Sequence, residues 1–194
     1  MPSFLPRIAG FFIYIKDFSM YDSKFDKAYK ILAECEGGYT DGRNQIDDEP
    51  TNMGIRQSTI DAYARNHPES NMPDNVKDLT AAQAREIYKS QYWDNTNIPK
   101  IENDRIRNAV FDMNVMSGIS NAVRTVQTAI NNTGGNIAVD GALGKNTLAA
   151  LNSIPVDKIA DFMDMLKTVR LDFLQQTPNW PTAKNGWIRR TGDY

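Results

Sequence analysis

Glu36 is the residue whose type and position best support chemistry. It shares one helical stripe with Phe25, Tyr29 and Leu32, since four side chains at these spacings fall within about 60° of arc. The apolar members predict that the stripe is buried. Burial, the negative helix end and nearby acids would each favour the protonated form of this carboxyl, which could then donate a proton to a glycosidic oxygen. Alternatively, Glu36 lies at a frayed, exposed helix end or pairs with an arginine.

A glycosidase also needs a second carboxylate. The two carboxyls lie about 5 to 5.5 Å apart in retaining enzymes and about 6.5 to 9.5 Å apart in inverting ones. Asp47 and Asp48, in the acidic loop that follows the predicted helix, are the first candidates, and Asp41 and Asp61 are further ones. The acidic run is equally explained as an ordinary solvated loop.

The composition excludes several other kinds of chemistry. The 194 residues are 41% hydrophobic and 24% charged, which suits one compact domain or two small helical halves. With only Cys35 and His67, the chain has no pair for a disulfide and no thiolate or histidine cluster for a metal, so we expect no metal and no cofactor. The 22 Lys and Arg against 24 Asp and Glu give a charge of -2, which predicts no general attraction to nucleic acid or anionic membranes.

The first residues contain a short apolar run. Residues 8–15 (IAGFFIYI) follow Arg7, but a membrane span needs about 20 apolar residues, and no small-residue cleavage site follows. We therefore expect residues 1–20 to form an N-terminal arm, with no clear signal peptide and no stable membrane insertion. A secretion signal is the less favoured alternative.

Helical periodicity and capping signals recur along the chain, so we predict an all-α fold. The expected helices run from Phe25 to the Gly37-Gly38 pair, from a Ser58 cap to about Asn66, from a Thr80 cap through Trp93, around Ile106 to Met113, from a Ser120 cap to about Gly134, over 147–151 and over 156–176. The turn-rich segment 39–55 is expected to be a small hairpin or an irregular loop. Residues 21–102 and 103–194 would form two halves packed as one compact unit.

Several ordered motifs resemble one known family. The segments 36–39 (EGGY) and 51–55 (TNMGI) resemble the E-G-G-Y and T-x-x-G-I signature of the glycoside hydrolase family 108 muramidases, also described as secretion activator proteins. The segment 79–93 resembles the next helix of that family. Further similarities to its C-terminal peptidoglycan-binding half fall at 111–112, 117–118, 140–147, Arg170 and 186–189.

This resemblance implies a lysozyme-like helical fold that hydrolyses the peptidoglycan bond after N-acetylmuramic acid, with Glu36 as general acid and Asp47 or Asp48 as the loop aspartate. Two segments depart from the family: its D-P-G-G-x-T reads DDEPT at 47–51, and its V-N-S-G reads VMSG at 115–118. The alternatives are therefore a catalytically silent peptidoglycan-binding or secretion-accessory protein, and an enzyme acting on a related glycan such as chitin.

Substrate binding should use flat aromatic faces and polar hydrogen-bonding groups. The candidates are Tyr39, Tyr92 and Trp93 for stacking, Thr51 and Asn52 for hydrogen bonds, and Asp140 in the DGALGKNT element at 140–147. A Tyr-Trp pair at a helix end is also typical of a core, and Asp140 is equally explained as a turn residue. Trp187, Arg189 and Arg190 are expected to clamp the C-terminal part of the fold. The expected partner is a peptidoglycan glycan strand, bound by a monomer made in the bacterial cytoplasm and acting at the cell wall or periplasm.

Overall fold

The computed structural model describes residues 23–43 and 49–192, so the predicted arm at 1–20 and the loop residues Asp47 and Asp48 lie outside the described residues. A helix runs through residues 23–35 and is called helix 23–35. The next elements are β1 (Thr51–Asn52), β2 (Ile55–Arg56), α2 (Gln57–Asn66), α3 (Ala81–Lys89), α4 (Asp104–Ser117), α5 (Ile119–Asn132), α6 (Lys145–Asn152), α7 (Ile159–Gln175) and α8 (Trp180–Thr191). A π-helical turn at Ser90–Asp94 continues α3, and 3-10 turns lie at Pro68–Ser70, Val76–Asp78, Ile98–Lys100 and Val156–Lys158.

Helices dominate this part of the chain, which confirms the predicted all-α class. Its sheet is the antiparallel pair β1 and β2, in which Thr51 lies opposite Arg56. The segment after helix 23–35 is thus a small hairpin, one of the two forms expected for it. None of the helices in the described residues is long and apolar enough to cross a membrane.

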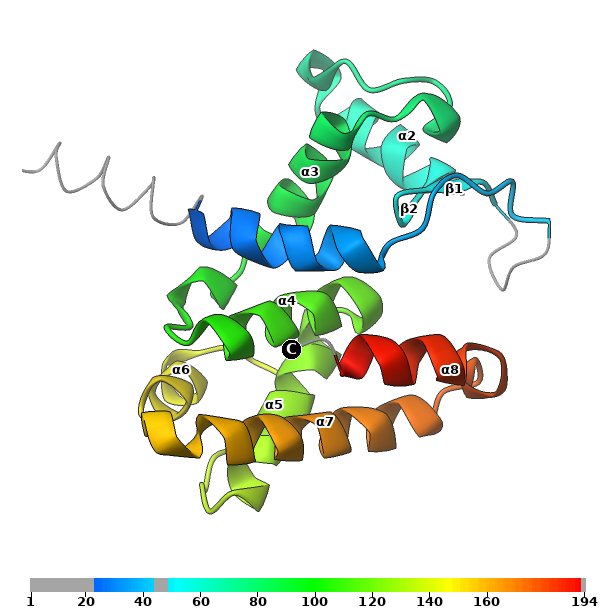
Figure 1. Cartoon of the computed structure of the whole chain (residues 1–194). Coiled ribbons are helices and arrows are strands. Elements are labelled where there is room, and N and C mark those ends of the chain that lie inside the picture. The colour runs from blue at the N-terminus through cyan, green and yellow to red at the C-terminus, as the bar shows by residue number, and fades with distance from the viewer. Residues whose placement is uncertain (1–22, 44–48, 193–194) are drawn as a thin grey trace, which may run out of the picture.

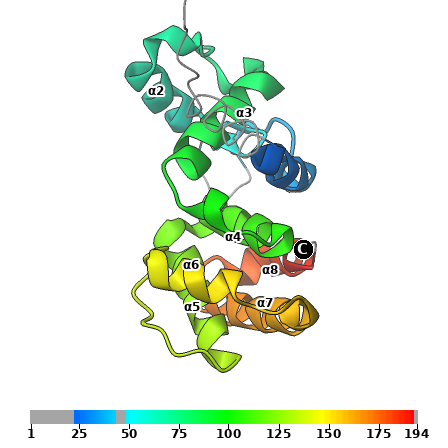
Figure 2. The same ribbon diagram turned by 90° about the vertical axis from the view of Figure 1, so that its left-hand side faces the viewer.

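The helices form two stacked groups (Figures 1 and 2). Helix 23–35, α2, α3 and the hairpin lie in the upper group, and α4 to α8 lie in the lower group. One hydrophobic cluster includes members of both groups, such as Phe25 and Leu32 above and Phe111 and Val126 below. The helix contacts are therefore continuous from one group to the other, while the boundary at residues 102 and 103 stays a prediction.

The predicted cap of α3 is confirmed. The backbone N–H of Gln83 donates to Thr80 Oγ1 over 3.3 Å, and the backbone N–H of Thr80 donates to Gln83 Oε1 over 3.0 Å. This reciprocal capping box satisfies donors that the first turn of a helix leaves unpaired.

The predicted serine caps of two other helices are wrong. Ser58 lies inside the first turn of α2, where its backbone N–H and hydroxyl donate to the Glu49 carboxylate, each over 2.9 Å. A carboxylate from the preceding loop thus covers this helix N-terminus, where negative charge is favourable. Ser120 lies inside α5, which begins after Gly118 at a φ of 81°.

Helix α8 was not predicted. Its sequence contains Pro181, Asn185 and Gly186, which are poor helix formers, and it has no regular apolar stripe. It forms because it packs along α7 (Figure 1), with Thr191 buried near its end. This packing carries Arg190 to the end of helix 23–35, 154 residues earlier in the chain.

Candidate active site

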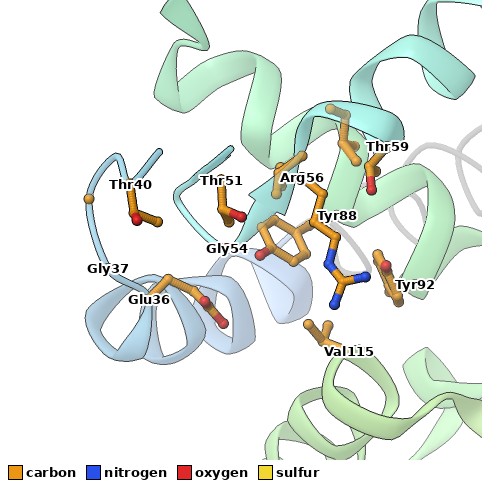
Figure 3. Close-up of a pocket in the computed structure, with 13 residues that line it drawn as sticks. Glu36, Gly37, Thr40, Thr51, Gly54, Arg56, Thr59, Tyr88, Tyr92 and Val115 are labelled. Carbon is orange, nitrogen blue, oxygen red and sulfur yellow. The ribbon is translucent and has the colours of Figure 1, made fainter. Parts of the chain in front are cut away.

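The site is a cleft of about 480 Å³ between the end of helix 23–35, the hairpin, α2, α3 and the last turn of α4. Figure 3 shows Glu36 on one side and Arg56, Thr59 and Tyr92 on the other, with Val115 of α4 below. Of the described residues that line the cleft, Glu36 is the one carboxylate. Its prediction as a site residue therefore agrees with its position.

Local sequence places the Glu36 side chain at the cleft. Helix 23–35 stops before the Gly37-Gly38 pair, and the backbone N–H of Glu36 still bonds to Leu32 O over 3.2 Å. The side chain is 16% exposed, which agrees with the predicted burial of its stripe. Its two oxygens have different neighbours: Oε1 meets a charged group and Oε2 meets the hairpin turn.

The charged neighbour of Glu36 is Arg190. Its Nη2 donates to Glu36 Oε1 over 2.9 Å, and its Nε donates to Asp112 Oδ1 over 2.6 Å. The other Asp112 oxygen accepts from Arg170 Nη2 over 2.5 Å, and the Asp112 side chain is 2% exposed. Two carboxylates and two arginines thus form one partly buried network. The arginine pairing that the sequence left open as an alternative is present.

The hairpin turn closes the other side of Glu36. Met53 and Gly54 have φ values of 49° and 74°, so both lie in the left-handed region. Glycine adopts this region without steric cost. A Cβ added at Gly54 would overlap Glu36 Oε2 and lie 2.6 Å from the Tyr88 hydroxyl. The absence of a side chain at Gly54 therefore allows the turn to approach the carboxylate.

Tyr88 is a neutral neighbour of this carboxylate. Its hydroxyl donates to Met53 O over 3.0 Å, and the residue is 3% exposed. Burial, followed by the nearby Glu36 charge, raises the pKa of Tyr88 far above its ordinary value. The phenol thus stays protonated and braces the turn on which Gly54 lies.

The remaining walls of the cleft carry hydroxyls, one guanidinium and one aromatic ring. Thr40 and Thr51 face each other through two backbone hydrogen bonds of 2.8 and 2.9 Å, and both line the cleft with Thr59. The Arg56 side chain is 48% exposed, with its Nε 3.9 Å from Glu49 Oε1. These groups supply the donors and acceptors that sugar hydroxyls and amides require.

Tyr92 lines the cleft as predicted, whereas its neighbour Trp93 does not. Tyr92 is partly buried, and Asn114 Nδ2 donates to its backbone oxygen over 2.9 Å. Trp93 is 1% exposed and lies edge-on against Phe25 and Phe111, with ring centroids 5.3 and 5.4 Å apart. The prediction of Trp93 as a sugar-stacking residue is corrected: the π-helical turn directs it into the core.

Three other predicted binding residues do not line the cleft. Tyr39 is 45% exposed and is covered by Lys77, whose Nζ lies 5.8 Å from the ring centroid. Asn52 is buried and donates to the backbone oxygens of Val76 and Lys77 over 3.0 and 3.3 Å, so it holds the hairpin to a 3-10 turn. The third, Asp140, lies between α5 and α6 in the lower group.

Asp140 braces a turn, which was the alternative explanation of its motif. Its Oδ1 accepts from the backbone N–H of Ala142 over 2.8 Å and from Gln127 Nε2 over 2.7 Å. The first of these bonds, followed by the second, lowers the pKa of Asp140. The residue lines no part of the cleft, and its predicted role in substrate binding stays a prediction.

The second catalytic carboxylate is not located among the described residues. Asp41 pairs with Arg43 over 3.3 Å, Asp61 accepts from Gln57 over 2.9 Å, and neither lines the cleft. Asp47 and Asp48 belong to the segment 44–48, outside the described residues, and stay predictions. Among the residues that the structure describes, no acidic, histidine or cysteine cluster could hold a metal ion.

Sequence reasoning missed several residues of the site. Arg56 and Thr59 lie on the short segment that opens α2, where the only signal was the neighbouring TNMGI motif. Arg190 carried no local signal, because its partners lie 78 and 154 residues away. Asp112 and Arg170 were noted only as part of a family resemblance, and their pairing depends on the packing of α4 against α7 and α8.

Comparisons with known proteins agree with this structure. Residues 29–118 match the sequence model of the family described as Glycosyl hydrolase 108. The solved structure of Brucella abortus SagA is similar, with a TM-score of 0.68 and 28% sequence identity over 88% of this chain and 91% of that chain. A search of curated proteins gave no significant match. The predicted lysozyme-like, all-α fold and the family resemblance are confirmed.

Proposed function

We propose that the protein hydrolyses the glycan of peptidoglycan at the bond after N-acetylmuramic acid, because residues 29–118 match the sequence model of the family described as Glycosyl hydrolase 108. Glu36 is the general acid in this proposal. The observation that carries it is the position of Glu36, the first residue of the EGGY motif. Its side chain is 16% exposed and lines a cleft that also carries hydroxyl groups. No cofactor takes part in the proposed reaction.

The surroundings of Glu36 suit proton donation. A sugar chain that fills the cleft removes water from the carboxyl and so favours its protonated form before the reaction. As the proton moves to the leaving oxygen, negative charge grows on Glu36, and the Arg190 guanidinium lies 2.9 Å away to stabilise it. Asp112 keeps Arg190 paired and oriented in both states.

The attacking water needs a position on the opposite face of the sugar. Thr40, Thr51 and Thr59 supply hydroxyls in the cleft that could hold it. We propose Asp47 or Asp48 as the base or nucleophile, on the sequence argument alone. Replacing each by asparagine tests this, since substitution of the residue that acts as base or nucleophile should lower activity by a factor of about 10² to 10⁴.

The partner in this proposal is a peptidoglycan glycan strand, reached at the cell wall or periplasm by a monomeric protein. The lower helical group, 103–194, is proposed to hold the wall as well as to complete the site through Arg190. The formal charge of -2 gives no general attraction to an anionic wall, so recognition in this proposal comes from specific contacts in the cleft and on the lower group.

A catalytically silent peptidoglycan-binding or secretion-accessory protein is the second candidate. Two observations favour it: Glu36 is paired with Arg190, and no second carboxylate lines the cleft in the described residues. Such a protein would bind glycan in the same cleft without cleaving it. The two candidates differ in whether the wall is broken.

The deciding experiment follows the turbidity of purified cell walls and the new reducing ends that appear. The wild type should clear the suspension and release muramic acid reducing ends. The Glu36→Gln variant should be slower by a factor of about 10² to 10⁴. Glu69→Gln, in an exposed 3-10 turn outside the cleft, is the matched control and should act as wild type.

Each outcome separates the candidates. Wall binding without lysis by the wild type would favour the silent protein. Equal lysis by wild type and Glu36→Gln would show that Glu36 is not the acid. Release of N-acetylglucosamine reducing ends alone would contradict the proposed bond.

A further inference from the structure

A second hollow lies beside the cleft, between the end of helix 23–35 and α8. Its volume is about 240 Å³, and its lining residues are Glu34, Cys35, Gly186, Trp187, Arg189 and Arg190. We call it the α8 hollow. It is separate from the cleft, since the two share no lining residue.

The cleft and the α8 hollow meet at one ion pair. Glu36 lines the cleft, Arg190 lines the α8 hollow, and the two side chains are joined over 2.9 Å. The proposed acid therefore has a hollow on each side. An enzyme that cuts within a chain has to bind substrate on both sides of the bond that breaks.

We propose that the α8 hollow is a second saccharide subsite, which takes a sugar ring of the glycan strand across the scissile bond from the cleft. This inference rests on the proposed function. It assigns to Trp187 and Arg189 a binding role in place of the clamp expected from the sequence. Arg190 would then contact both the acid and the bound strand.

The lining of the α8 hollow suits a sugar ring. Trp187 is partly buried and packs against Trp180, with ring centroids 6.4 Å apart and an angle of 41° between the ring planes. This contact restricts the orientation of the Trp187 indole. Gly186 also lines the hollow, and a Cβ built there meets nothing within 4 Å, so the hollow is open at this position. A pyranose ring presents an apolar C–H face that packs on such an aromatic surface.

The charges around the α8 hollow favour a neutral ligand over an anionic peptide. Arg190 is already balanced by Glu36 and Asp112, and Glu34 offsets Arg189. Carboxylate and guanidinium groups beside an aromatic ring supply acceptors and donors for sugar hydroxyls. The balanced lining therefore matches a polyhydroxylated ring.

The spacing along α8 links this subsite to the acid. Trp187 and Arg190 are three residues apart on a helix, so both side chains lie on the face turned toward helix 23–35. A ring stacked on Trp187 would thus lie next to the Arg190 guanidinium and continue the path of the strand past Glu36.

The test measures the affinity of the full-length Glu36→Gln protein for peptide-free peptidoglycan glycan fragments of one, two, three and four disaccharide units, by calorimetry. Affinity should rise with length until both hollows are filled. Adding Trp187→Ala should weaken binding of the longest fragments by about tenfold, equivalent to about 1.4 kcal/mol, and binding of a single disaccharide far less.

Two further variants distinguish the loss of a sugar contact from a general disturbance of α8. Trp187→Phe keeps a flat ring and should restore most of the affinity for long fragments. Ile188→Ala, at a 49% exposed neighbour outside both hollows, should leave every affinity unchanged. Thermal unfolding of each variant reports whether α8 is still packed.

The outcomes distinguish the subsite from the proposed function. An equal loss at all fragment lengths, or no loss at any length, would overturn the subsite. The same titrations are repeated with peptide-bearing fragments, and a loss seen only with these would assign the hollow to the stem peptide and overturn the sugar assignment. If the wild type fails to lyse walls but the length-dependent loss is found, the subsite stands while the hydrolase proposal fails.

Discussion

The two walls that enclose Glu36 differ in origin and in chemistry. The hairpin wall, defined by Met53, Gly54 and Tyr88, is neutral and lies within 52 residues of Glu36 along the chain. The arginine wall, defined by Asp112, Arg170 and Arg190, is charged and comes from α4, α7 and α8. The hairpin wall thus confines the Glu36 side chain, and the arginine wall places a positive charge beside it.

Only the first of these walls belongs wholly to the matched family segment. Residues 29–118 include the hairpin wall and Asp112, but Arg170 and Arg190 lie beyond that segment. The lower helical group therefore completes the environment of the acid as well as supporting the fold. Variants of each wall should therefore differ in their effects on stability and activity, and the largest effect is expected in the arginine wall.

Removing the charge of Asp112 should cause the largest loss of stability. Asp112→Asn removes the charge of the buried carboxylate that bonds both Arg170 and Arg190, which should lower the free energy of unfolding by about 3 to 5 kcal/mol. Glu36→Gln should cost far less, because Arg190 keeps its bond to Asp112. Denaturant unfolding of both variants measures this difference, and equal losses would show that the two carboxylates have the same structural role.

Replacing Arg190 should lower the rate of wall cleavage. In Arg190→Gln the positive charge 2.9 Å from Glu36 Oε1 is lost, so the negative charge that grows on the general acid during the reaction is no longer stabilised, and activity should fall by a factor of about 10² to 10³. The matched variant Arg190→Lys keeps the charge and should retain more of the activity, although one of the two hydrogen bonds is lost. The rate at which the turbidity of purified cell walls falls measures the difference.

Equal rates of cleavage by Arg190→Gln and the wild type would contradict this role of the arginine wall. Equal losses of activity in Arg190→Gln and Arg190→Lys, each matched by a loss of stability, would show that Arg190 acts on structure alone. Thermal unfolding of the two variants supplies the stability measurement.

The contrast between the walls also explains what the sequence could predict. Glu36, its stripe and the Gly37-Gly38 stop are local features, and the helical period and glycine chemistry were enough to place them. The Thr80 capping box was equally local. The predicted caps at Ser58 and Ser120 were wrong because a serine near a helix start need not be its first residue. Only the tertiary structure shows that the Glu49 carboxylate covers the N-terminus of α2.

The errors share a dependence on the packing of distant segments. Trp93 lies next to a true cleft residue, but the π-helical turn at Ser90–Asp94 decides which ring faces the core. Helix α8 has weak intrinsic propensity, so its existence depends on packing against α7. The Glu36–Arg190 pair depends in turn on α8, and no local pattern could have predicted it.

A side chain at Gly54 should break the hairpin wall with a moderate effect. Gly54→Ala combines a φ of 74° with overlap on Glu36 Oε2, so we expect activity to fall by more than about tenfold and stability by about 1 to 2 kcal/mol. Gly144→Ala is the matched control, because a Cβ there meets nothing within 4 Å and the position lies outside both hollows. Cell-wall turbidity and thermal unfolding provide the two measurements.

The smallest effect concerns the hydroxyl of Tyr88. Burial raises the pKa of this phenol above its ordinary value of about 10, so the folded state holds a proton that the unfolded state releases at high pH. The contribution to stability is therefore complete below about pH 10 and declines as the pH rises above that value. Tyr88→Phe removes this decline and the bond to Met53 O, with a loss of about 1 kcal/mol near neutral pH.

Urea unfolding from pH 7 to pH 11 checks both parts of the Tyr88 prediction. The difference in stability between wild type and Tyr88→Phe should shrink as the pH rises above about 10, since only the wild type loses the contribution of this phenol. A difference that stays constant over this range would mean that Tyr88 ionises as readily in the folded protein as in the unfolded chain. The hairpin wall would then lack the dry, neutral character that distinguishes it from the arginine wall.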